Sequence, residues 1–551
     1  MKRTVPSLAI ILSSIASLSV GTQLQAQTAD TNAPAVPAIA GASTAGAEIR
    51  TPPAPHAPRI NGPDIFGVRP GNPFFYQIPV TGDRPMTFSA SHLPGGLKLD
   101  PATGLITGSL HKKWFGWKNK FTVTLRAKNA LGEDRRKFRI VVGETIALTP
   151  PLGWNSWNCW GVSVDADKVR ASADAMVKSG LINHGWSYIN IDDTWQGKRG
   201  GTFNGIQPNE KFPDMAALGE QVHGMGLRFG IYSTPWTSSY AGYIGGSSDE
   251  TNGAWSRGGG RRDGKYSFAE NDAKQWGAWG VDYLKYDWNP KSSKDTVEKF
   301  ISDVSTMAHA LRHSGRDILY SYSNSMPPEW IKDVNRYFNC WRTTGDINDT
   351  WWRLMDIGLA QSRWTAYSGP GHWNDPDMLV VGYVDVGKGK DLHPSRLTAD
   401  EQYTHITWWC LLAAPLLIGC DMDRLDDFTL NLLANDEVLA VDQDSLGRQA
   451  VVVSQEGPEV TLVNHRSNRP DQTKTFDARQ VWARPLADSS HAVGLFNFGD
   501  TNLTVTVKWA DLKISGSRTV RDLWRQKDLG KFDGDFSMAI APHSAELVKI
   551  K

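Results

Sequence analysis

Between residues 148 and 445, short apolar runs alternate with longer segments whose apolar residues recur at helical spacing. The longer segments predict helices, as in the set Val169, Ala173, Met176 and Val177. Eight strand and helix units in roughly 300 residues predict an α/β fold of the (β/α)8 TIM barrel type, with a doubly wound sheet as the alternative, although no GxGxxG follows the first strand. The predicted strands are 152–157, 188–193, 228–233, 282–287, 318–323, 339–344, 372–379 and 415–420.

Two regions of alternating apolar and polar residues flank this segment. Residues 59–147 contain short alternating runs separated by Gly, Pro and Asn, which predicts an N-terminal β-sandwich. Alternation returns over 446–551, where for example Leu503, Val505 and Val507 fall on one face. We therefore expect a C-terminal antiparallel β-domain after the predicted barrel, which spans 148–445.

The N-terminus has the pattern of a secretory signal. Lys2 and Arg3 precede an apolar stretch that ends in small and polar residues near Ala26, which predicts a signal peptide over 1–26. Residues 27–58 are rich in Ala, Pro and Thr and contain no Phe, Trp or Tyr, so we expect a disordered linker there. The apolar run 407–420 is shorter than a membrane span. The prediction is an exported protein without a membrane span, periplasmic or extracellular.

The composition excludes some functions and permits others. The chain has 59 Lys and Arg against 58 Asp and Glu, a formal charge of +1 without a long basic run, so nucleic acid is not an expected partner. The 23 Trp residues suit either flat ligands such as sugar rings or a large aromatic core. Export permits disulfides, but the four cysteines lack the CxxC and His spacing of a metal site. They are Cys159, Cys340, Cys410 and Cys420.

One predicted strand carries two charged residues. In "GVDYLKYDWNP" over 280–290, Lys285 and Asp287 point to the same face because side chains alternate along a strand. The two residues could form a structural ion pair, since buried charges persist mainly when they are paired. Alternatively, they could belong to a site at the carboxyl end of the strand.

The other strand ends favour the second interpretation. Active sites of (β/α)8 barrels lie at the carboxyl ends of the strands. Carboxylates, cations and aromatic residues follow one predicted strand after another, and structural pairs alone would not recur at the same end. We expect Asp375 to be structural; Asp192 and Asp193 could alternatively cap a helix, and Trp157 could be a core residue. The residues at these strand ends are Trp157, Asp192, Asp193, Tyr232, Lys285, Asp287, Arg342, Asp346, Asp375 and Asp377.

Carboxylates and aromatic residues without a metal-ligand pattern suit glycoside hydrolysis. This reaction uses one carboxylate as nucleophile or base and another as proton donor, and it needs no cofactor or metal. Lys285 could keep Asp287 ionised, and Asp346 lies on a loop where a donor could reach the leaving oxygen. The expected partner is therefore a carbohydrate substrate.

Seven motifs together resemble glycoside hydrolase family 27, the α-galactosidases and α-N-acetylgalactosaminidases. The motifs are "PPLGWNSWNCW", "YINIDDTW", "FGIYS", "YLKYDWN", "CWRTTGDI", "GPGHWNDPDML" and "APLLIGCD". The resemblance implies a retaining double displacement with Asp287 as nucleophile and Asp346 as acid/base. It also implies sugar contacts through Trp157, Asp192, Asp193, Tyr232, Lys285, Arg342, Asp377 and Met378, with the two adjacent aspartates on O4 and O6. The segment 93–110 resembles the immunoglobulin-like domains of many bacterial exported proteins.

Two positions depart from the family pattern. Many α-galactosidases have Cys-Glu-Trp after the fifth strand, with the Glu near the 2-hydroxyl, where this chain has Ser323, Asn324 and Ser325. Asn289 replaces a Cys found two residues after the nucleophile, so that family disulfide cannot form. We expect Asn324 to contact the sugar. Because of this change, a β-L-arabinopyranosidase remains the alternative to an exo-acting α-galactosidase, followed by a sugar-binding protein without catalysis.

Overall fold

The computed structural model describes residues 44, 46–111, 118–249, 262–289, 296–385, 391–467 and 469–551. The chain divides into two units, Met1–Ile39 and Ala40–Lys551, and only the second contains described residues. The predicted signal peptide and the linker up to residue 43 therefore lie outside the described residues. Among the helices in these ranges, none combines the length and the apolar character needed to cross a membrane.

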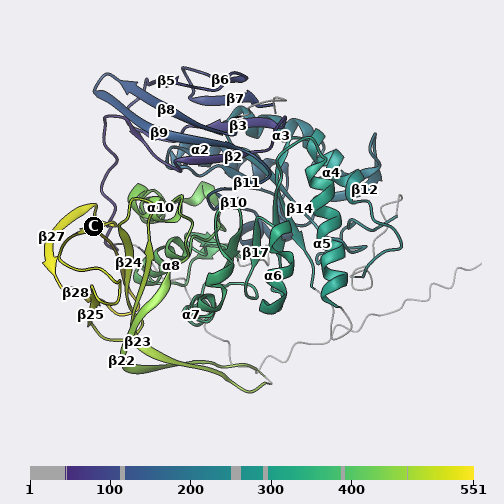
Figure 1. Ribbon diagram of the computed structural model, residues 1–551. Coiled ribbons are helices and arrows are strands. Elements are labelled where there is room, and N and C mark those ends of the chain that lie inside the picture. Colours follow the sequence, from purple (N-terminus) through teal and green to yellow (C-terminus); the bar gives the residue numbers. More distant parts are fainter. Residues whose placement is uncertain are drawn as a thin grey trace, which may run out of the picture. The chain divides into compact units, whose positions relative to one another are not determined.

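The central element is an eight-stranded parallel sheet (Figure 1). A further parallel bridge joins Leu379, which follows the edge strand Trp373–Asp375, to Ile418 in the opposite edge strand, Leu416–Ile418. This bridge closes the sheet into a barrel. Each of the eight predicted strands overlaps one observed strand, which confirms the barrel. In sheet order these are β18 (Trp373–Asp375), β17 (Cys340–Arg342), β16 (Leu319–Ser323), β15 (Val281–Asp287), β14 (Arg228–Ser233), β11 (Tyr188–Asn190), β10 (Leu152–Asn155) and β21 (Leu416–Ile418).

Five of these strands end earlier than predicted: β10, β11, β17, β18 and β21. Trp157 begins a short helix after β10, and β18 stops at Asp375 because Asp377 adopts a left-handed φ of 88°. A strand cannot continue through that conformation. Trp157 and Asp377 therefore lie beyond the strand ends, at the carboxyl end of the barrel.

The helices connect the strands, and several of them begin at side-chain caps. Asp165 accepts a hydrogen bond from Lys168 N, and Thr398 and Glu401 form a capping box at α8. The α-helices are α1 (Trp157–Trp160), α2 (Ala166–Lys178), α3 (Met215–Gly224), α4 (Ala269–Ala278), α5 (Val297–Arg312), α6 (Ile331–Val334), α7 (Trp351–Leu359), α8 (Ala399–Leu412), α9 (Asp427–Leu433) and α10 (Asp436–Asp442). Two antiparallel strand pairs, β12 (Gln196–Gly200) with β13 (Gly205–Pro208) and β19 (Tyr383–Val384) with β20 (His393–Pro394), and short 3-10 turns accompany the barrel.

The N-terminal domain is a β-sandwich with its own core, which includes Phe74, Val123 and Ile140. One sheet has the order β2-β9-β8-β5 and the other β3-β7-β6, with β1 paired to β4. The strands are β1 (Arg59–Ile60), β2 (Ile65–Val68), β3 (Pro73–Gln77), β4 (Val80–Thr81), β5 (Thr87–Ser91), β6 (Leu97–Leu99), β7 (Leu105–Ser109), β8 (Lys120–Asn129) and β9 (Gly132–Val142).

This sandwich packs on the amino-terminal end of the barrel. Arg228, the first residue of β14, donates to the carbonyl of Phe75, and Asp317 accepts from Asn72 Nδ2 at 2.8 Å. A cavity between the two domains includes Tyr188, the first residue of β11. The sandwich therefore lies at the end of the barrel away from the residues that close each strand.

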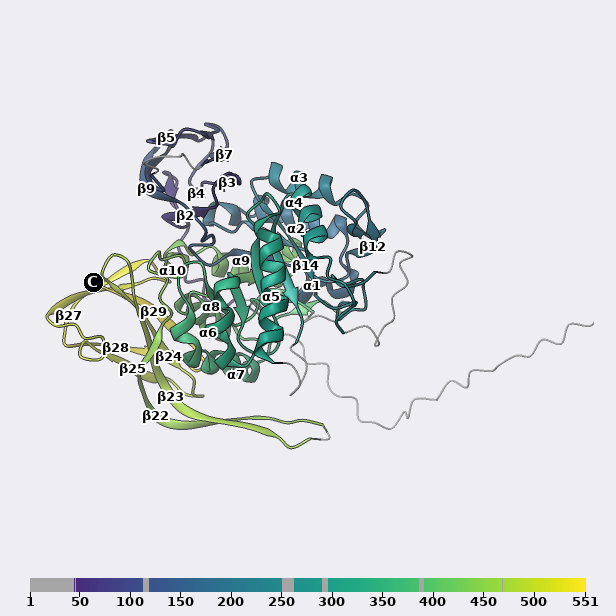
Figure 2. The same ribbon diagram turned by 45° about the vertical axis from the view of Figure 1, so that its right-hand side comes forward.

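The C-terminal domain is antiparallel, as predicted, and has a six-stranded sheet ordered β22-β23-β24-β29-β26-β27 beside the pair β25 and β28. Figure 2 shows β22 and β23 continuing as a two-stranded ribbon beyond the rest of their sheet. The strands are β22 (Val451–Asn464), β23 (Gln472–Pro485), β24 (His491–Asn497), β25 (Leu503–Lys508), β26 (Ser517–Asp522), β27 (Lys527–Asp533), β28 (Asp535–Ile540) and β29 (Ala545–Ile550).

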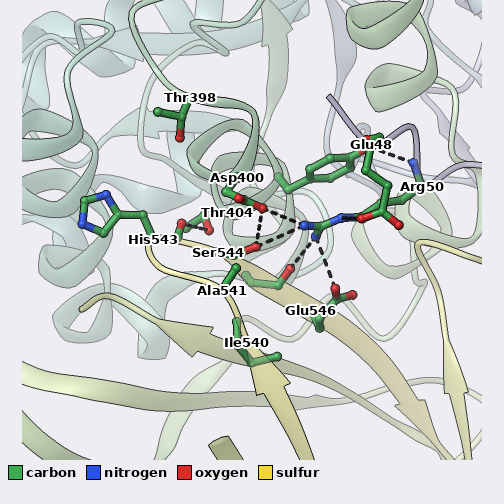
Figure 3. Close-up of polar contacts among 12 residues, drawn as sticks. Glu48, Arg50, Thr398, Asp400, Thr404, Ile540, Ala541, His543, Ser544 and Glu546 are labelled. Carbon is green, nitrogen blue, oxygen red and sulfur yellow. Dashed lines mark hydrogen bonds and ion pairs between the residues drawn. The ribbon is translucent and has the colours of Figure 1, made fainter. Parts of the chain in front are cut away.

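The end of the predicted linker differs from the expectation. Arg50 is buried, and its guanidinium pairs with Asp400 at 2.7 Å and Glu546 at 3.4 Å, donates to Ser544 at 3.2 Å and stacks 4.1 Å from the Tyr403 ring centroid (Figure 3). The linker contains no Phe, Trp or Tyr, but one well-paired cation fixes this segment between α8 and β29.

Candidate active site

The site is a small cavity of about 210 Å³ at the carboxyl ends of the barrel strands. Every catalytic and sugar-contacting residue that the sequence predicted lines it. The structure adds four residues to the lining: Asn158, Tyr240, Ser323 and Ile347. The predicted residues are Trp157, Asp192, Asp193, Tyr232, Lys285, Asp287, Asn324, Arg342, Asp346, Asp377 and Met378.

Strand β15 places Lys285 and Asp287 in this cavity. Lys285 pairs in register with Tyr232 on β14, and Asp287 pairs with Ser323 on β16. The Lys285 ammonium lies 2.8 Å from Asp192 Oδ2. Burial opposes its charge, but the carboxylates of Asp192 and Asp287 raise the pKa of Lys285 above its ordinary value. The charges on this strand therefore belong to a shared site rather than to an isolated pair.

Asp287 is buried, with 9% of the residue exposed. The Tyr232 hydroxyl lies 3.1 Å from Asp287 Oδ2, and Asn324 Nδ2 donates to Oδ1. Burial raises the pKa of Asp287 to about 7, although Lys285 acts in the opposite direction. Both carboxylate oxygens thus have a neutral donor, and the group exchanges its proton near neutral pH.

Asp346 has the opposite environment. Its side chain is 89% exposed, and Arg342 Nη2 lies 3.2 Å from Oδ1. The Arg342 cation lowers the pKa of Asp346. Because the two aspartates interact, they titrate as a pair. When no sugar is bound and the pair carries one proton, that proton is mainly on Asp287.

The adjacent pair Asp192 and Asp193 is held by backbone groups. Asp193 accepts from Thr194 N at 2.7 Å and from Ala241 N at 2.9 Å, while burial raises its pKa to about 6. The next regular element is the strand β12, so these aspartates do not cap a helix. The alternative of a capping role is therefore wrong in this structure.

Arg342 also organises the opposite wall. Its Nη2 lies 2.8 Å from Asp377 Oδ2, which accepts a further hydrogen bond from Ile347 N at 2.8 Å. Asp375 does not line the cavity, and its Oδ1 accepts from Asp377 N at 2.8 Å. Asp375 has the structural role that the sequence indicated.

Tyr240 is the lining residue that sequence reasoning missed most clearly. It lies on the long segment after β14, far from any strand end, and its hydroxyl is 3.3 Å from Asn324 Nδ2. Its ring packs edge-on against Trp236 at 5.4 Å. A strand-end rule has no signal for a residue that a long loop folds back into the site.

Metal binding and disulfides receive no geometric support. Within the ranges that the structure describes, no group of three or more His, Cys, Asp or Glu side chains could hold a metal ion. The four cysteines are buried free thiols, and burial raises the pKa of Cys159, as of Cys340 and Cys410.

Three family models match this chain. The α-galactosidase A family model matches residues 149–444, the α-galactosidase C-terminal β-sandwich model matches 476–550, and an Ig domain model matches 57–143. An α-galactosidase of Cyamopsis tetragonoloba is 36% identical over 77% of this chain and 92% of its own length.

Two solved structures extend the likeness to the fold. A candidate α-galactosidase of Bacteroides fragilis has a TM-score of 0.74 and 33% identity, covering 90% of this chain and 98% of its own. A family 27 β-L-arabinopyranosidase of Geobacillus stearothermophilus has a TM-score of 0.60 and 27% identity, covering 74% and 97%. The chain therefore belongs to the α-galactosidase family of glycoside hydrolases.

Proposed function

We propose that the protein is an exo-acting, retaining α-galactosidase that removes terminal α-D-galactosyl residues from oligosaccharides or polysaccharides. The observation that carries this proposal is the pairing of a buried Asp287, held by two neutral donors, with an exposed Asp346 in one small cavity. Such a pair of carboxyl groups is what a double displacement needs. The size of the cavity suits one sugar residue and therefore action at a chain end.

In the first step, a carboxylate oxygen of Asp287 attacks the anomeric carbon and forms a covalent glycosyl ester. The bond to the leaving oxygen breaks at the same time, and the proton of Asp346 moves to that oxygen. Asp287 suits attack because it is buried inside the cavity, and Asp346 suits donation because its side chain is exposed.

In the second step, the Asp346 carboxylate takes a proton from water while the water oxygen attacks the anomeric carbon. The ester bond breaks, Asp287 regains its negative charge, and the sugar leaves with its original anomeric configuration. Two inversions at one carbon explain the retention.

The proton has to move within the pair before the first step. In the empty site it favours Asp287, because burial raises the Asp287 pKa and Arg342 lowers the Asp346 pKa. A bound glycoside adds an acceptor oxygen beside Asp346, which favours the protonated form of that carboxyl. The reaction therefore needs one proton on the pair, and sugar binding selects its position.

Asp192 and Asp193 support recognition of galactose. We assign them to O4 and O6, since two adjacent buried carboxylates can accept from an axial 4-hydroxyl and a primary alcohol. Both carboxylates are held in place, because the Lys285 ammonium pairs with Asp192 and Ala241 N donates to Asp193. A site built around specific hydroxyls discriminates strongly against a sugar that lacks one.

A β-L-arabinopyranosidase is the second candidate. The motivating observations are Asn324 in the cavity, in place of the Glu of many relatives, and the likeness to the Geobacillus stearothermophilus enzyme. β-L-Arabinopyranosides share the ring stereochemistry of α-D-galactosides and lack C6. A sugar-binding protein without catalysis ranks below both because the two carboxyl groups are in place.

The deciding experiment compares hydrolysis of 4-nitrophenyl α-D-galactopyranoside, β-L-arabinopyranoside and α-N-acetylgalactosaminide by the purified protein. We expect the highest kcat/KM on the galactoside, with the α-anomer of galactose as the first product by NMR. Preference for the arabinopyranoside would move the assignment to the second candidate, and inactivity on all three would contradict the proposal.

We also propose that the protein is exported, because the N-terminal 26 residues have the pattern of a signal peptide. Cell fractionation and N-terminal sequencing test this proposal. Export predicts a mature chain that begins near residue 27 outside the cytoplasm, and an uncleaved chain in the cytoplasm would contradict it.

A further inference from the structure

The Asn324 side chain contacts both the Asp287 carboxylate and the Tyr240 hydroxyl. Its Nδ2 donates to Asp287 Oδ1 and lies 3.3 Å from the hydroxyl oxygen of Tyr240. The two N–H groups of one amide nitrogen can serve these two oxygens together. The position predicted to contact sugar thus contacts the reacting carboxyl itself.

The backbone supports this orientation. Asn324 is the first residue after β16 and has a left-handed φ of 77°. Most L-residues are strained in this region, whereas Asn tolerates it. The neighbouring residue Ser323 pairs in register with Asp287, so the left-handed turn brings the Asn324 amide over the end of β15. The local fold therefore presents this side chain to Asp287.

We infer that Asn324 is a positioning residue that holds Oδ1 of the nucleophile Asp287, and that the Tyr240 hydroxyl fixes the orientation of its amide. This inference rests on the proposed function, in which Asp287 is the attacking group. The amide holds one carboxylate oxygen while Tyr232 holds the other, so that rotation of the carboxyl group is restricted before attack. Asn324 acts through Asp287.

Asp287 has several charged or titratable neighbours, and the effect of Asn324 is superimposed on theirs. These are Lys285 on the same strand, Tyr232 on β14, Tyr322 on β16, Asp192 after β11 and Asp346 after β17. Asn324 donates to the ionised carboxylate, which favours the charged form without adding a charge.

Two substitutions at Asn324 test the role. Asn324→Gly fits the left-handed backbone and removes the amide, and Asn324→Asp keeps the shape but replaces the donor with a carboxylate. We expect kcat to fall at least about tenfold in Asn324→Gly and the kcat/KM pH profile to shift up by about one unit. Asn324→Asp should shift the profile further, because a second negative charge faces Asp287.

Tyr240→Phe and a matched control complete the set. Tyr240→Phe should lower kcat less than Asn324→Gly, because the amide loses only its second partner. Asn204 is exposed, also has a left-handed φ of 51°, and lies in the turn between β12 and β13 outside the cavity. Asn204→Asp should therefore leave the kinetics and the pH profile unchanged.

A substrate without the 2-hydroxyl distinguishes a role of Asn324 in positioning Asp287 from a role in binding the 2-hydroxyl of the sugar. If Asn324 positions Asp287, Asn324→Gly lowers kcat by a similar factor on galactosides and 2-deoxygalactosides. If Asn324→Gly has an unchanged kcat on the 2-deoxygalactoside, or if the substitution changes only KM, the inference is overturned in favour of direct 2-hydroxyl recognition.

NMR titration gives a readout that needs no turnover. With 13C-labelled aspartate, the Asp287 carboxyl should titrate about one unit higher in Asn324→Gly than in the unsubstituted protein. The Asp287 signal is identified from its loss in Asp287→Asn. An unchanged titration would overturn the inference even if the galactosidase activity were present. Conversely, a shifted titration without activity on any tested sugar would support the contact and contradict only the proposed reaction.

Discussion

The ammonium of Lys285 lies 2.8 Å from Oδ2 of Asp192, and only 14% and 3% of the two side chains are exposed. This contact joins β15 to the end of β11 and places a fixed cation near the reacting carboxyl. The pair therefore connects sugar recognition with the protonation state of Asp287.

Replacing Lys285 by Met should move the pH profile of kcat/KM upward. The cation favours ionised Asp287, so its loss raises the pKa values of the catalytic pair by at least about one unit. Activity requires a single proton on that pair, and both limbs of a bell-shaped profile should shift to higher pH. Lys274→Met is the control, because the Lys274 side chain lies on the exposed face of α4. A lower rate without a shift would show that Lys285 only binds sugar.

The unsubstituted protein should be most active below neutral pH. Asp287 holds the pair's proton in the empty site, and its pKa is raised to about 7. As the pH rises through this value, the pair loses its last proton and kcat/KM should fall about tenfold per unit. Initial rates between pH 4 and pH 9 at constant ionic strength, an interval that brackets the pKa, check this limb. A profile flat to pH 9 would contradict it.

The catalytic aspartates should differ in their dependence on the leaving group. Asp287→Ala should abolish turnover of every galactoside while leaving the circular dichroism spectrum unchanged, because no ester can form. Asp346→Ala should spare activated aryl galactosides far more than natural oligosaccharides, since a good leaving group needs no proton. Added azide should give α-galactosyl azide with Asp346→Ala only. Substantial activity in Asp287→Ala would exclude it as nucleophile.

Asn substitutions at Asp192 and Asp193 should separate recognition of O4 from recognition of O6. The variant that loses the O6 contact should lose at least about a hundredfold on galactoside relative to arabinopyranoside, which lacks that hydroxyl. The variant that loses the O4 contact should lower both rates together. Equal effects of both variants on the two sugars would contradict the assignment to O4 and O6.

Arg50→Met should destabilise the protein without changing kcat. It removes one of two cationic partners of the buried Glu546, which keeps Arg525 at 3.0 Å. The cost should therefore be about 2 kcal/mol, below the roughly 3–5 kcal/mol of breaking a fully buried pair, and the Asp400 side chain is 39% exposed. Because the entropy of unfolding grows with chain length, we expect a Tm lower by about 2 °C. Glu48→Gln is the control, since the Glu48 side chain is 60% exposed and its pairs contribute little. An unchanged Tm for Arg50→Met would show that this segment carries no stability.

The barrel and most of its cavity could be predicted because parallel strands bring their ends to one rim. Asp287 and Arg342 are final residues of strands and were placed correctly by that rule. Tyr240 and the Arg50 contacts could not be predicted, because each depends on partners far along the chain. Tyr240 meets Asn324 across 84 residues, and Arg50 meets Glu546 across nearly the whole described chain.

The N-terminal sandwich packs at the Arg228 end of the barrel, whereas Asp287 closes the other end of its strand. Because of this separation, the sandwich is a suitable site for attaching the enzyme to other molecules or surfaces. A support, a dye or a second protein coupled to the exposed Leu131 turn between β8 and β9 would leave the entrance for substrate open. Immobilised in this orientation, the enzyme should cleave a bulky polymer as fast as it does in free solution.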